Sequence, residues 1–266
     1  MKKIYAVAMV FLLSSGLCAI QTKDVIYNDF AEKDPKKSYE GYLALPDVIQ
    51  KNNPSVLIFH AWKGLGEHEK ETARRLAKLG YVAFAADVYG QGIRPKTNQE
   101  AAKLSSFYKE NRNILREHAQ LALSVLKKTK GVTDEKMVAL GYCFGGTTAL
   151  ELARDHAKLA GVVSFHGGLD ASEKYPSSLP VYPKLLILHG AEDPYVGEDI
   201  VSAFKKEAKA LNLDYQLIMY SGAVHAFTDR AAGNDPSTGA AYQELADHRS
   251  WNAMKHFIQS IKSSSH

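Results

Sequence analysis

The chain of 266 residues is long enough for one large domain, and its hydrophobic (45%) and charged (23%) fractions are ordinary for a globular protein. The formal net charge is +4, and it falls to about +2 if Lys2 and Lys3 are removed with the leader described below, so the charge balance does not favour nucleic acid or an anionic membrane as a partner. Composition therefore excludes a disordered, repetitive or strongly basic chain.

The first 19 residues have the layout of a secretory signal peptide. Lys2 and Lys3 precede an apolar run over residues 4–13, and small residues follow as far as Ala19. The run is too short for a membrane span. We therefore expect cleavage after Gly16 or Ala19, a periplasmic or secreted protein, and no stable membrane association afterwards. A buried N-terminal helix would need a polar face, which this segment lacks.

The two cysteines raise separate questions. Cys18 could accept a lipid, but the bulky Leu17 stands where a lipoprotein signal usually has a small residue. Removal of the leader would leave Cys143 as the single cysteine of the mature chain, so an intramolecular disulfide could not form. An unpaired thiol is unusual in an exported protein, and it favours a reactive role for Cys143.

The mature chain opens with a predicted β-hairpin over residues 24–45, with a polar turn over 32–37. Buried apolar strands then alternate with helical segments, which is typical of a doubly wound parallel sheet. We predict strands over 55–60, 81–86, 137–141, 160–165, 184–189 and 215–220. We predict helices over 67–79, 98–107, 113–130, 145–155, 198–211 and 241–261. No segment marks a domain boundary, so we predict a single α/β domain over residues 24–262.

The third parallel strand runs into Gly141-Tyr142-Cys143-Phe144-Gly145, the thiol version of the G-x-S-x-G nucleophile elbow. Glycines two before and two after the nucleophile let strand and helix approach closely. The turn would also place Cys143 at a helix N-terminus, where N–H groups favour the thiolate. The alternative is a buried cysteine that acts as a small apolar residue beside loop glycines.

Polar residues at other strand ends complete a catalytic pattern, because sites in such sheets form at the carboxyl ends of strands. Asp193 follows the strand over 184–189, and His225 follows the strand over 215–220. The order Cys143, Asp193, His225 is the one expected of an α/β-hydrolase triad. Asp193 could instead stabilise a turn ahead of Pro194. Three further histidines at strand ends compete with His225, namely His60, His166 and His189.

Each member of this predicted triad has a chemical role. Cys143 would attack an acyl carbonyl, His225 would take the thiol proton and later activate water, and Asp193 would hold the imidazole in its productive tautomer. We expect the oxyanion to bind the backbone N–H groups of Phe144 and Trp62. Trp62, Tyr89 and Phe144 could also line a substrate pocket, or they could be ordinary core residues.

These motifs together resemble those of the dienelactone hydrolase family. The resemblance rests on residues 141–146, on Gly190-Ala191-Glu192-Asp193, on Val224-His225-Ala226-Phe227 and on the strand segment 80–90. It covers nearly the whole mature chain. It implies an α/β-hydrolase fold, no metal or other cofactor, and hydrolysis of esters or lactones by a Cys-His-Asp triad.

The chain also departs from that family. Better-known members have a glutamate just after the first parallel strand, where this chain has Ala61. The family uses arginines to hold a carboxylated lactone; here Arg230, or Arg94 if the loop is shifted, could serve. These departures leave the natural substrate open. Without the glutamate, we expect Cys143 to pair directly with His225.

The leading hypothesis is an exported, cysteine-dependent hydrolase of small carboxylic esters or lactones that needs no cofactor, as a monomer or a dimer. A second hypothesis is a redox or peroxide-reactive protein that uses Cys143 alone, although the chain offers no resolving cysteine. A third is a catalytically silent binding domain on the same fold.

Overall fold

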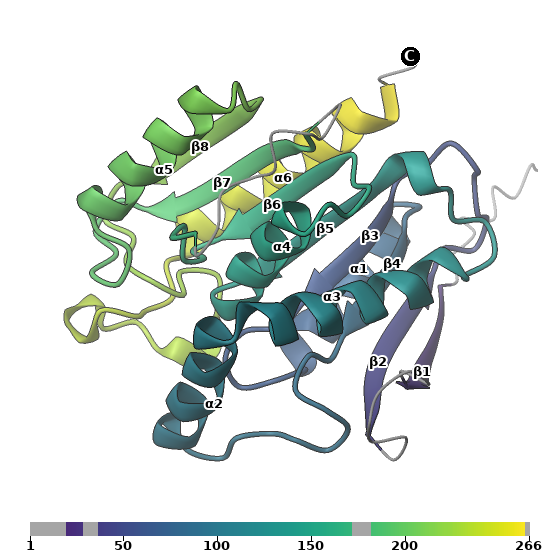
Figure 1. The fold of residues 1–266 in the computed structure, drawn as a ribbon, viewed down its shortest axis with the longest axis horizontal. Coiled ribbons are helices and arrows are strands. Elements are labelled where there is room, and N and C mark those ends of the chain that lie inside the picture. Colours follow the sequence, from purple (N-terminus) through teal and green to yellow (C-terminus); the bar gives the residue numbers. More distant parts are fainter. Residues whose placement is uncertain (1–19, 29–36, 172–181, 264–266) are drawn as a thin grey trace, which may run out of the picture.

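A computed structural model describes residues 20–28, 37–171 and 182–263. These residues form an eight-stranded sheet in the order β1-β2-β4-β3-β5-β6-β7-β8 (Figure 1). The strands are β1 (Gln21–Asn28), β2 (Ser38–Leu45), β3 (Ser55–Phe59), β4 (Val82–Ala86), β5 (Met137–Tyr142), β6 (Gly161–Phe165), β7 (Lys184–Gly190) and β8 (Tyr215–Tyr220). The strand pairs β1–β2 and β2–β4 are antiparallel, and every other pair in this sheet is parallel.

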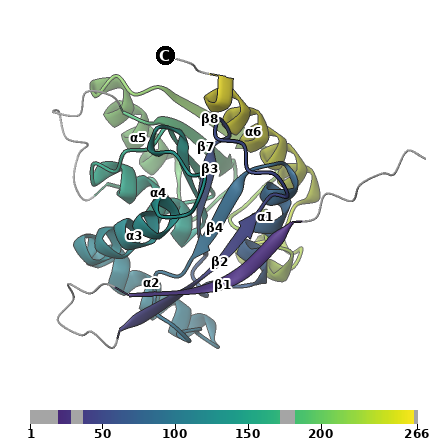
Figure 2. The same cartoon turned by 90° about the vertical axis from the view of Figure 1, so that its right-hand side faces the viewer.

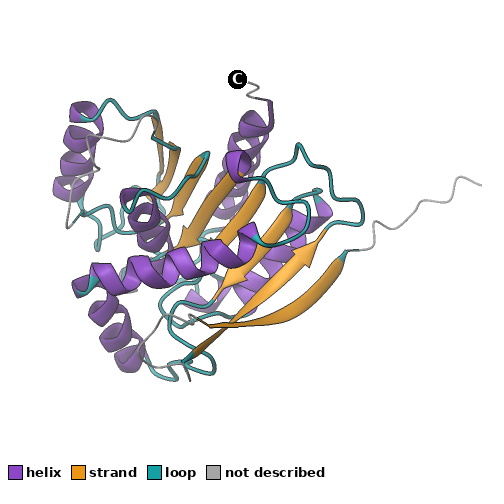
Figure 3. Cartoon of the chain, turned by 45° about the vertical axis from the view of Figure 1, so that its right-hand side comes forward, coloured by secondary structure: helices purple, strands orange, loops and turns teal. Residues whose placement is uncertain are grey.

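Helices connect the parallel strands and cover both faces of the sheet. They are α1 (Glu67–Lys78), α2 (Asn98–Glu110), α3 (Arg112–Lys127), α4 (Phe144–Arg154), α5 (Glu198–Ala210) and α6 (Glu244–Ser263). Figure 2 shows α1 and α6 on one face and α2, α3, α4 and α5 on the other. The topology confirms the predicted α/β-hydrolase architecture, with an antiparallel hairpin at one edge of a mostly parallel sheet (Figure 3).

The core is divided into two layers because side chains along each strand alternate between the two faces. In β3, for example, Val56 and Ile58 pack with the α1 and α6 side, whereas Leu57 and Phe59 pack with the opposite side. All four side chains are fully buried. This burial on both faces explains why the central strands are continuous apolar runs in the sequence.

A chain of aromatic rings connects the N-terminal hairpin to the centre of the molecule. Its ring centroids are 4.9–5.5 Å apart at each step. The rings belong, in order, to Tyr27, Tyr39, His118, Tyr108, Tyr89 and Phe144. Such contacts add to area burial by about 0.5–1.5 kcal/mol per pair. The hairpin is therefore packed into the domain rather than attached to its surface.

The predicted elements are all present, with differences at their ends. Helix α2 extends to Glu110, three residues beyond its predicted end, and α6 begins at Glu244 instead of residue 241. Gly80 ends α1 as predicted: its φ is 92°, and its N–H donates to the Ala77 carbonyl oxygen at 2.9 Å. The sequence patterns missed three short 3₁₀ turns, at Asp134–Lys136, Arg230–Ala232 and Pro236–Thr238.

Some sequence predictions fall outside the described residues. The predicted signal peptide (1–19) and most of the hairpin turn (32–37) are among them. In the part of the chain that is described, no helix has the length and apolarity needed to cross a membrane. Within the same residues, no group of three or more histidine, cysteine or acidic side chains could hold a metal ion.

Candidate active site

Cys143 lies at the turn between β5 and α4, at the carboxyl edge of the sheet. Its backbone has φ 53° and ψ −114°, which L-residues rarely adopt. Two glycines permit this turn. A Cβ on Gly141 would lie 2.1 Å from the Gly145 carbonyl carbon, and a Cβ on Gly145 would lie 2.2 Å from the Phe59 carbonyl oxygen. The local sequence therefore dictates a sharp turn that projects a half-buried thiol from the sheet edge.

Asp193 and His225 meet at the same edge. Asp193 is buried in the turn after β7, and its Oδ1 accepts hydrogen bonds from the N–H groups of Tyr195 (2.9 Å) and Val196 (3.3 Å). Its Oδ2 is 2.7 Å from His225 Nδ1. A carboxylate can only accept, so Nδ1 carries the proton that is donated to Asp193. This leaves His225 Nε2 available for the thiol.

The charges of Cys143 and His225 stabilise each other. Burial raises the pKa of the Cys143 thiol, but attraction to the His225 cation and a hydrogen bond with it outweigh burial, and the net shift is downward. Burial lowers the pKa of His225, but the Cys143 thiolate and the Asp193 hydrogen bond together raise it to about 10. The coupling of the two groups therefore favours a thiolate beside an imidazolium.

The predicted oxyanion-binding loop follows β3 and is held by a buried glutamate. Glu69 accepts hydrogen bonds from the N–H groups of Ala61 (3.2 Å) and Gly66 (3.0 Å). The Tyr89 hydroxyl donates to the Trp62 carbonyl oxygen at 3.0 Å. Within the described residues the Trp62 N–H has no hydrogen-bond partner. Sequence reasoning missed Glu69, although a glutamate at the third residue of a helix is a capping signal.

The predicted substrate residues have different surroundings. Tyr89 is fully buried against Phe144, at 5.3 Å between ring centroids, so both aromatic side chains belong to the core next to the site rather than to an open substrate pocket. Burial raises the pKa of the Tyr89 hydroxyl, and the nearby Cys143 thiolate raises it further. Arg94 donates to the Leu65 carbonyl oxygen at 2.8 Å and pairs with Glu40, so its guanidinium fastens the loop after β3.

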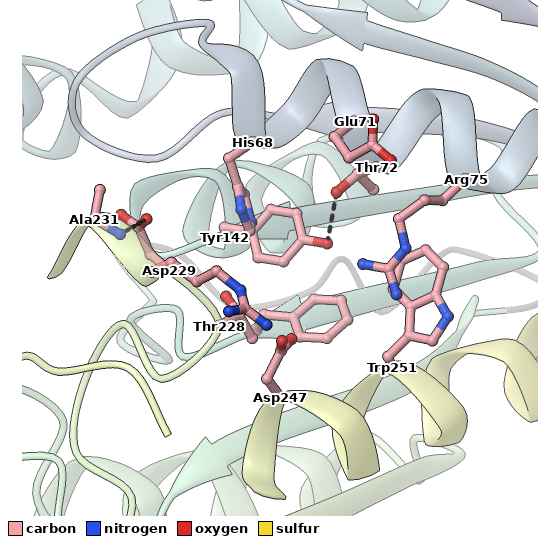
Figure 4. A pocket seen from close by; sticks show the side chains of 12 residues that line it. His68, Glu71, Thr72, Arg75, Tyr142, Thr228, Asp229, Ala231, Asp247 and Trp251 are labelled. Carbon is pink, nitrogen blue, oxygen red and sulfur yellow. Dashed lines mark hydrogen bonds between the residues drawn. The ribbon is translucent and has the colours of Figure 1, made fainter. Parts of the chain in front are cut away.

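Arg230 lines a separate cavity of about 330 Å³ between α1 and α6 (Figure 4). Its guanidinium lies over the Tyr242 ring, at 4.8 Å from the centroid. On another wall Arg75 lies 3.5 Å from the centroid of the Trp251 ring. In the described part of the chain, no hydrogen bond or ion pair joins Arg230 to Cys143, Asp193 or His225. Its role in substrate binding stays a prediction.

The three competing histidines lie in other surroundings. His60 Nε2 accepts from the Val88 N–H at 3.1 Å, and burial lowers its pKa to about 4. His189 is buried at the end of β7, and burial lowers its pKa. His166 Nδ1 accepts from the Cys143 N–H at 3.2 Å. Of these four strand-end histidines, His225 is the one hydrogen bonded to the predicted acid.

Comparisons with known proteins agree with this architecture. The family model described as "Dienelactone hydrolase family" matches residues 39–262. A crystal structure of a dienelactone hydrolase-like promiscuous phosphotriesterase from metagenomic libraries is 34% identical, with a TM-score of 0.82. That alignment covers 91% of this chain and 99% of the other.

Two curated relatives extend the comparison. An uncharacterized protein of Caenorhabditis elegans, K02A2.1, is 34% identical over 146 residues, covering 54% of this chain and 92% of that protein. A Bradyrhizobium protein named "Probable 2-oxo-3-(5-oxofuran-2-ylidene)propanoate lactonase" is 28% identical over 221 residues, covering 79% of this chain and 85% of that protein. The chain belongs to the dienelactone hydrolase family and is a hydrolase of the carboxylic ester and lactone class.

Proposed function

We propose that this hydrolase cleaves a small carboxylic ester or lactone through an acyl-enzyme on Cys143, with His225 as acid and base and Asp193 as its orienting partner. The observation that carries the proposal is the charge coupling of Cys143 to a histidine whose Nδ1 is fixed 2.7 Å from a buried carboxylate. A thiolate is the nucleophilic form of cysteine, so the resting pair is already activated.

In the first half-reaction the Cys143 thiolate attacks the acyl carbon, a C–S bond forms, and the carbonyl oxygen becomes an oxyanion. The N–H groups of Phe144 and Trp62 would bind that oxyanion. The tetrahedral intermediate collapses with breakage of the C–O bond, and the His225 imidazolium donates its proton to the departing alkoxide. A lactone would keep this alcohol in the same molecule as the acyl group.

In the second half-reaction neutral His225 takes a proton from water, the hydroxide attacks the thioester carbon, and breakage of the C–S bond restores the thiolate. The charge coupling assists this step. The Cys143 charge is the largest contribution that raises the pKa of His225. Acylation removes that charge, so the pKa of His225 falls and the imidazole becomes a competent base.

Short-chain aryl esters test this mechanism with the wild type beside Cys143→Ala and His225→Ala. We expect a burst of the aryl alcohol followed by turnover in the wild type, and neither in the two variants. Mass spectrometry of the quenched wild type should find an acyl group on Cys143. Equal background rates in three folded proteins would contradict the proposal. Cys143→Ser should retain a low esterase activity, because the turn, the N–H donors and His225 remain.

One relative suggests a second substrate class. The 34% identical structure is named as a promiscuous phosphotriesterase, and a thiolate can attack phosphorus as well as an acyl carbon. We include turnover of an aryl phosphotriester as a candidate side activity. It should depend on Cys143 and be lost in Cys143→Ala; a rate unchanged by that substitution would remove the candidate.

The proposed site of action is the periplasm or the extracellular medium, on the basis of the leader over residues 1–19. Expression of the full chain in a bacterial host, followed by fractionation and mass measurement of the mature N-terminus, tests this. Cleavage after residue 16 or 19 would support it, and a lipid on Cys18 would identify the lipoprotein alternative. An uncleaved cytoplasmic chain would contradict export.

A further inference from the structure

His166 is a buried histidine that the proposed mechanism does not use. It follows β6 with a backbone φ of 40° and is 2% exposed. The Cys143 N–H is shared between the Phe165 carbonyl oxygen at 2.9 Å and His166 Nδ1 at 3.2 Å, and His166 Nε2 is 2.9 Å from Thr228 Oγ1. Because Nδ1 is an acceptor, the ring proton of neutral His166 is on Nε2 and is donated to Thr228. One imidazole thus bridges the nucleophile and the segment that carries His225.

The ring of His166 also touches the ring of His225. Their centroids are 5.2 Å apart and the planes meet at 66°. Burial lowers the pKa of His166, and the nearby His225 charge lowers it further. His166 therefore stays neutral beside the imidazolium. It can support the catalytic pair by contact without adding a second positive charge that would compete for the thiolate.

Backbone strain is concentrated at this bridge. Among the described residues, five non-glycine residues have positive φ, and three of them are Cys143, His166 and Ala226. Ala226 lies between His225 and Thr228 in the chain. Strained backbone persists where surrounding interactions over-determine it, and such residues concentrate at functional sites. The hydrogen bonds of His166 connect two of these turns and reach two residues beyond the third.

We propose that His166 is a positioning residue that fixes the separation of the Cys143 thiolate and the His225 imidazolium. It acts through the Cys143 N–H on one side and Thr228 on the other, and it takes no proton in the reaction. This inference rests on the proposed function for its effect on turnover. Its effect on the thiol can be measured without any substrate.

Three variants separate the two contacts of His166. His166→Leu removes both hydrogen bonds at similar volume. His166→Asn keeps an acceptor near the Cys143 N–H and tolerates a positive φ. Thr228→Val removes the acceptor of the Nε2 proton with little change of shape. His118→Leu is the matched control, because His118 is also buried and hydrogen bonded but contacts Tyr39 and Val88 instead of the turn.

The primary measurement is the pH dependence of Cys143 alkylation by iodoacetamide in the mature protein. In His166→Leu we expect the midpoint to rise by about one pH unit or more, as the thiolate loses part of its partner. We expect kcat to fall on the order of 10- to 100-fold with KM within about threefold of the wild type, since misplacement affects the chemical step. His166→Asn should recover most of the loss, and His118→Leu should keep the wild-type midpoint.

A folded His166→Leu with the wild-type alkylation midpoint and kcat would overturn the proposal. An equal midpoint shift in His118→Leu would also overturn it, because the effect would then reflect any lost core histidine. If His166→Leu does not fold, Thr228→Val decides by the same midpoint: it should rise because the Nε2 proton of His166 loses its acceptor, and an unchanged midpoint would overturn the proposal. A midpoint shift in a protein without esterase activity would uphold the positioning role while rejecting the proposed hydrolysis.

Discussion

The two ends of α4 each carry a cluster of ionisable side chains, and the clusters differ in how completely their charges are compensated. At the N-terminal end the pKa of Cys143 is lowered mainly by His225, with the Lys109 charge as a weaker contribution, although burial raises it. At the C-terminal end Glu151 is fully buried, and it faces three guanidinium groups at N–O distances of 2.8–3.3 Å. These belong to Arg112, Arg116 and Arg154.

Two further acids pair with guanidinium groups around Glu151. Asp170 pairs with Arg112 at 2.7 Å, and Glu207 pairs with Arg154 at 3.4 Å. Every charge in this cluster has an opposite charge nearby, so no group there is ready to react. The cluster at Cys143 is less compensated and partly open to solvent. A nucleophile needs this incomplete compensation, because its charge must be transferred to the substrate.

Asp193→Asn should break the catalytic cluster with the largest effect on rate. An asparagine amide can donate to His225 Nδ1. The proton of the neutral ring would then lie on Nε2, which faces the thiol, and His225 could not accept the thiol proton there. We expect kcat to fall by about 10³- to 10⁴-fold. Steady-state kinetics measures this, and a melting curve close to that of the wild type controls for folding. A loss below about tenfold would show that Asp193 does not orient the base.

Glu151→Gln should break the structural cluster instead. It leaves three buried guanidinium groups without their common partner, and we expect a loss of about 3–5 kcal/mol in the free energy of unfolding. Urea denaturation measures this, and kcat per folded molecule should be unchanged. Glu207→Gln is the matched control, with a smaller loss, because within the described residues Glu207 forms an ion pair with one arginine, Arg154, and is partly exposed. Equal losses of unfolding free energy in both variants would contradict the role of Glu151 as the common partner of the three guanidinium groups.

The pH dependence of kcat/KM tests the charge state of the catalytic cluster. The pKa of Cys143 is lowered, so the thiolate persists below the ordinary thiol pKa and is lost only as pH falls through the lowered value. On the alkaline side, activity should fall near pH 10, where His225 loses the proton that it donates to the leaving group. On both the acidic and the alkaline side of the profile, kcat/KM should approach a tenfold fall per pH unit. A rise in kcat/KM through pH 8–9 would instead indicate an ordinary thiol.

Lys109→Gln should have the smallest effect. Lys109 is exposed on α2, and its charge lowers the pKa of Cys143 as a minor contribution after that of His225. We expect the alkylation rate of Cys143 at pH 7 to fall by less than about threefold, and the difference to vanish at high salt, where exposed charges are screened. Lys103→Gln, on the same helix, is the control and should have no effect. A tenfold change would mean that Lys109 is a direct partner of the thiolate.

Local sequence accounts for most of the fold. The glycines at 141 and 145 dictate the turn at Cys143, and the apolar runs of the central strands follow from burial on both faces. The predicted end of α2 and the predicted start of α6 each differ from the observed one by three residues. Helix propensity alone does not determine where a helix begins or ends, because tertiary packing can override a weak local signal. The 3₁₀ turns after β8 were missed because turns with Asp, Pro and Gly also resemble plain loops.

For the candidate site, the sequence placed Cys143, Asp193 and His225 at strand ends, and their catalytic roles stay predictions. What it could not supply was contact between distant residues. Glu69 holds the loop after β3 from within a helix, and Arg94 clamps that loop from a distant segment. The sequence pattern suggests His166 only as a rival base. Its hydrogen bond to the Cys143 N–H depends on strand order, which no local pattern encodes.

The aromatic chain from Tyr27 to Phe144 joins the N-terminal hairpin to the core of the domain. The hairpin is synthesised first, yet its ring partners Tyr89, Tyr108 and His118 are contributed much later in the chain. Its packing must therefore wait for distant segments, a high contact order that slows folding. Truncation or fusion inside residues 20–45 would expose these rings, so the far end of α6 is the better place for an added tag.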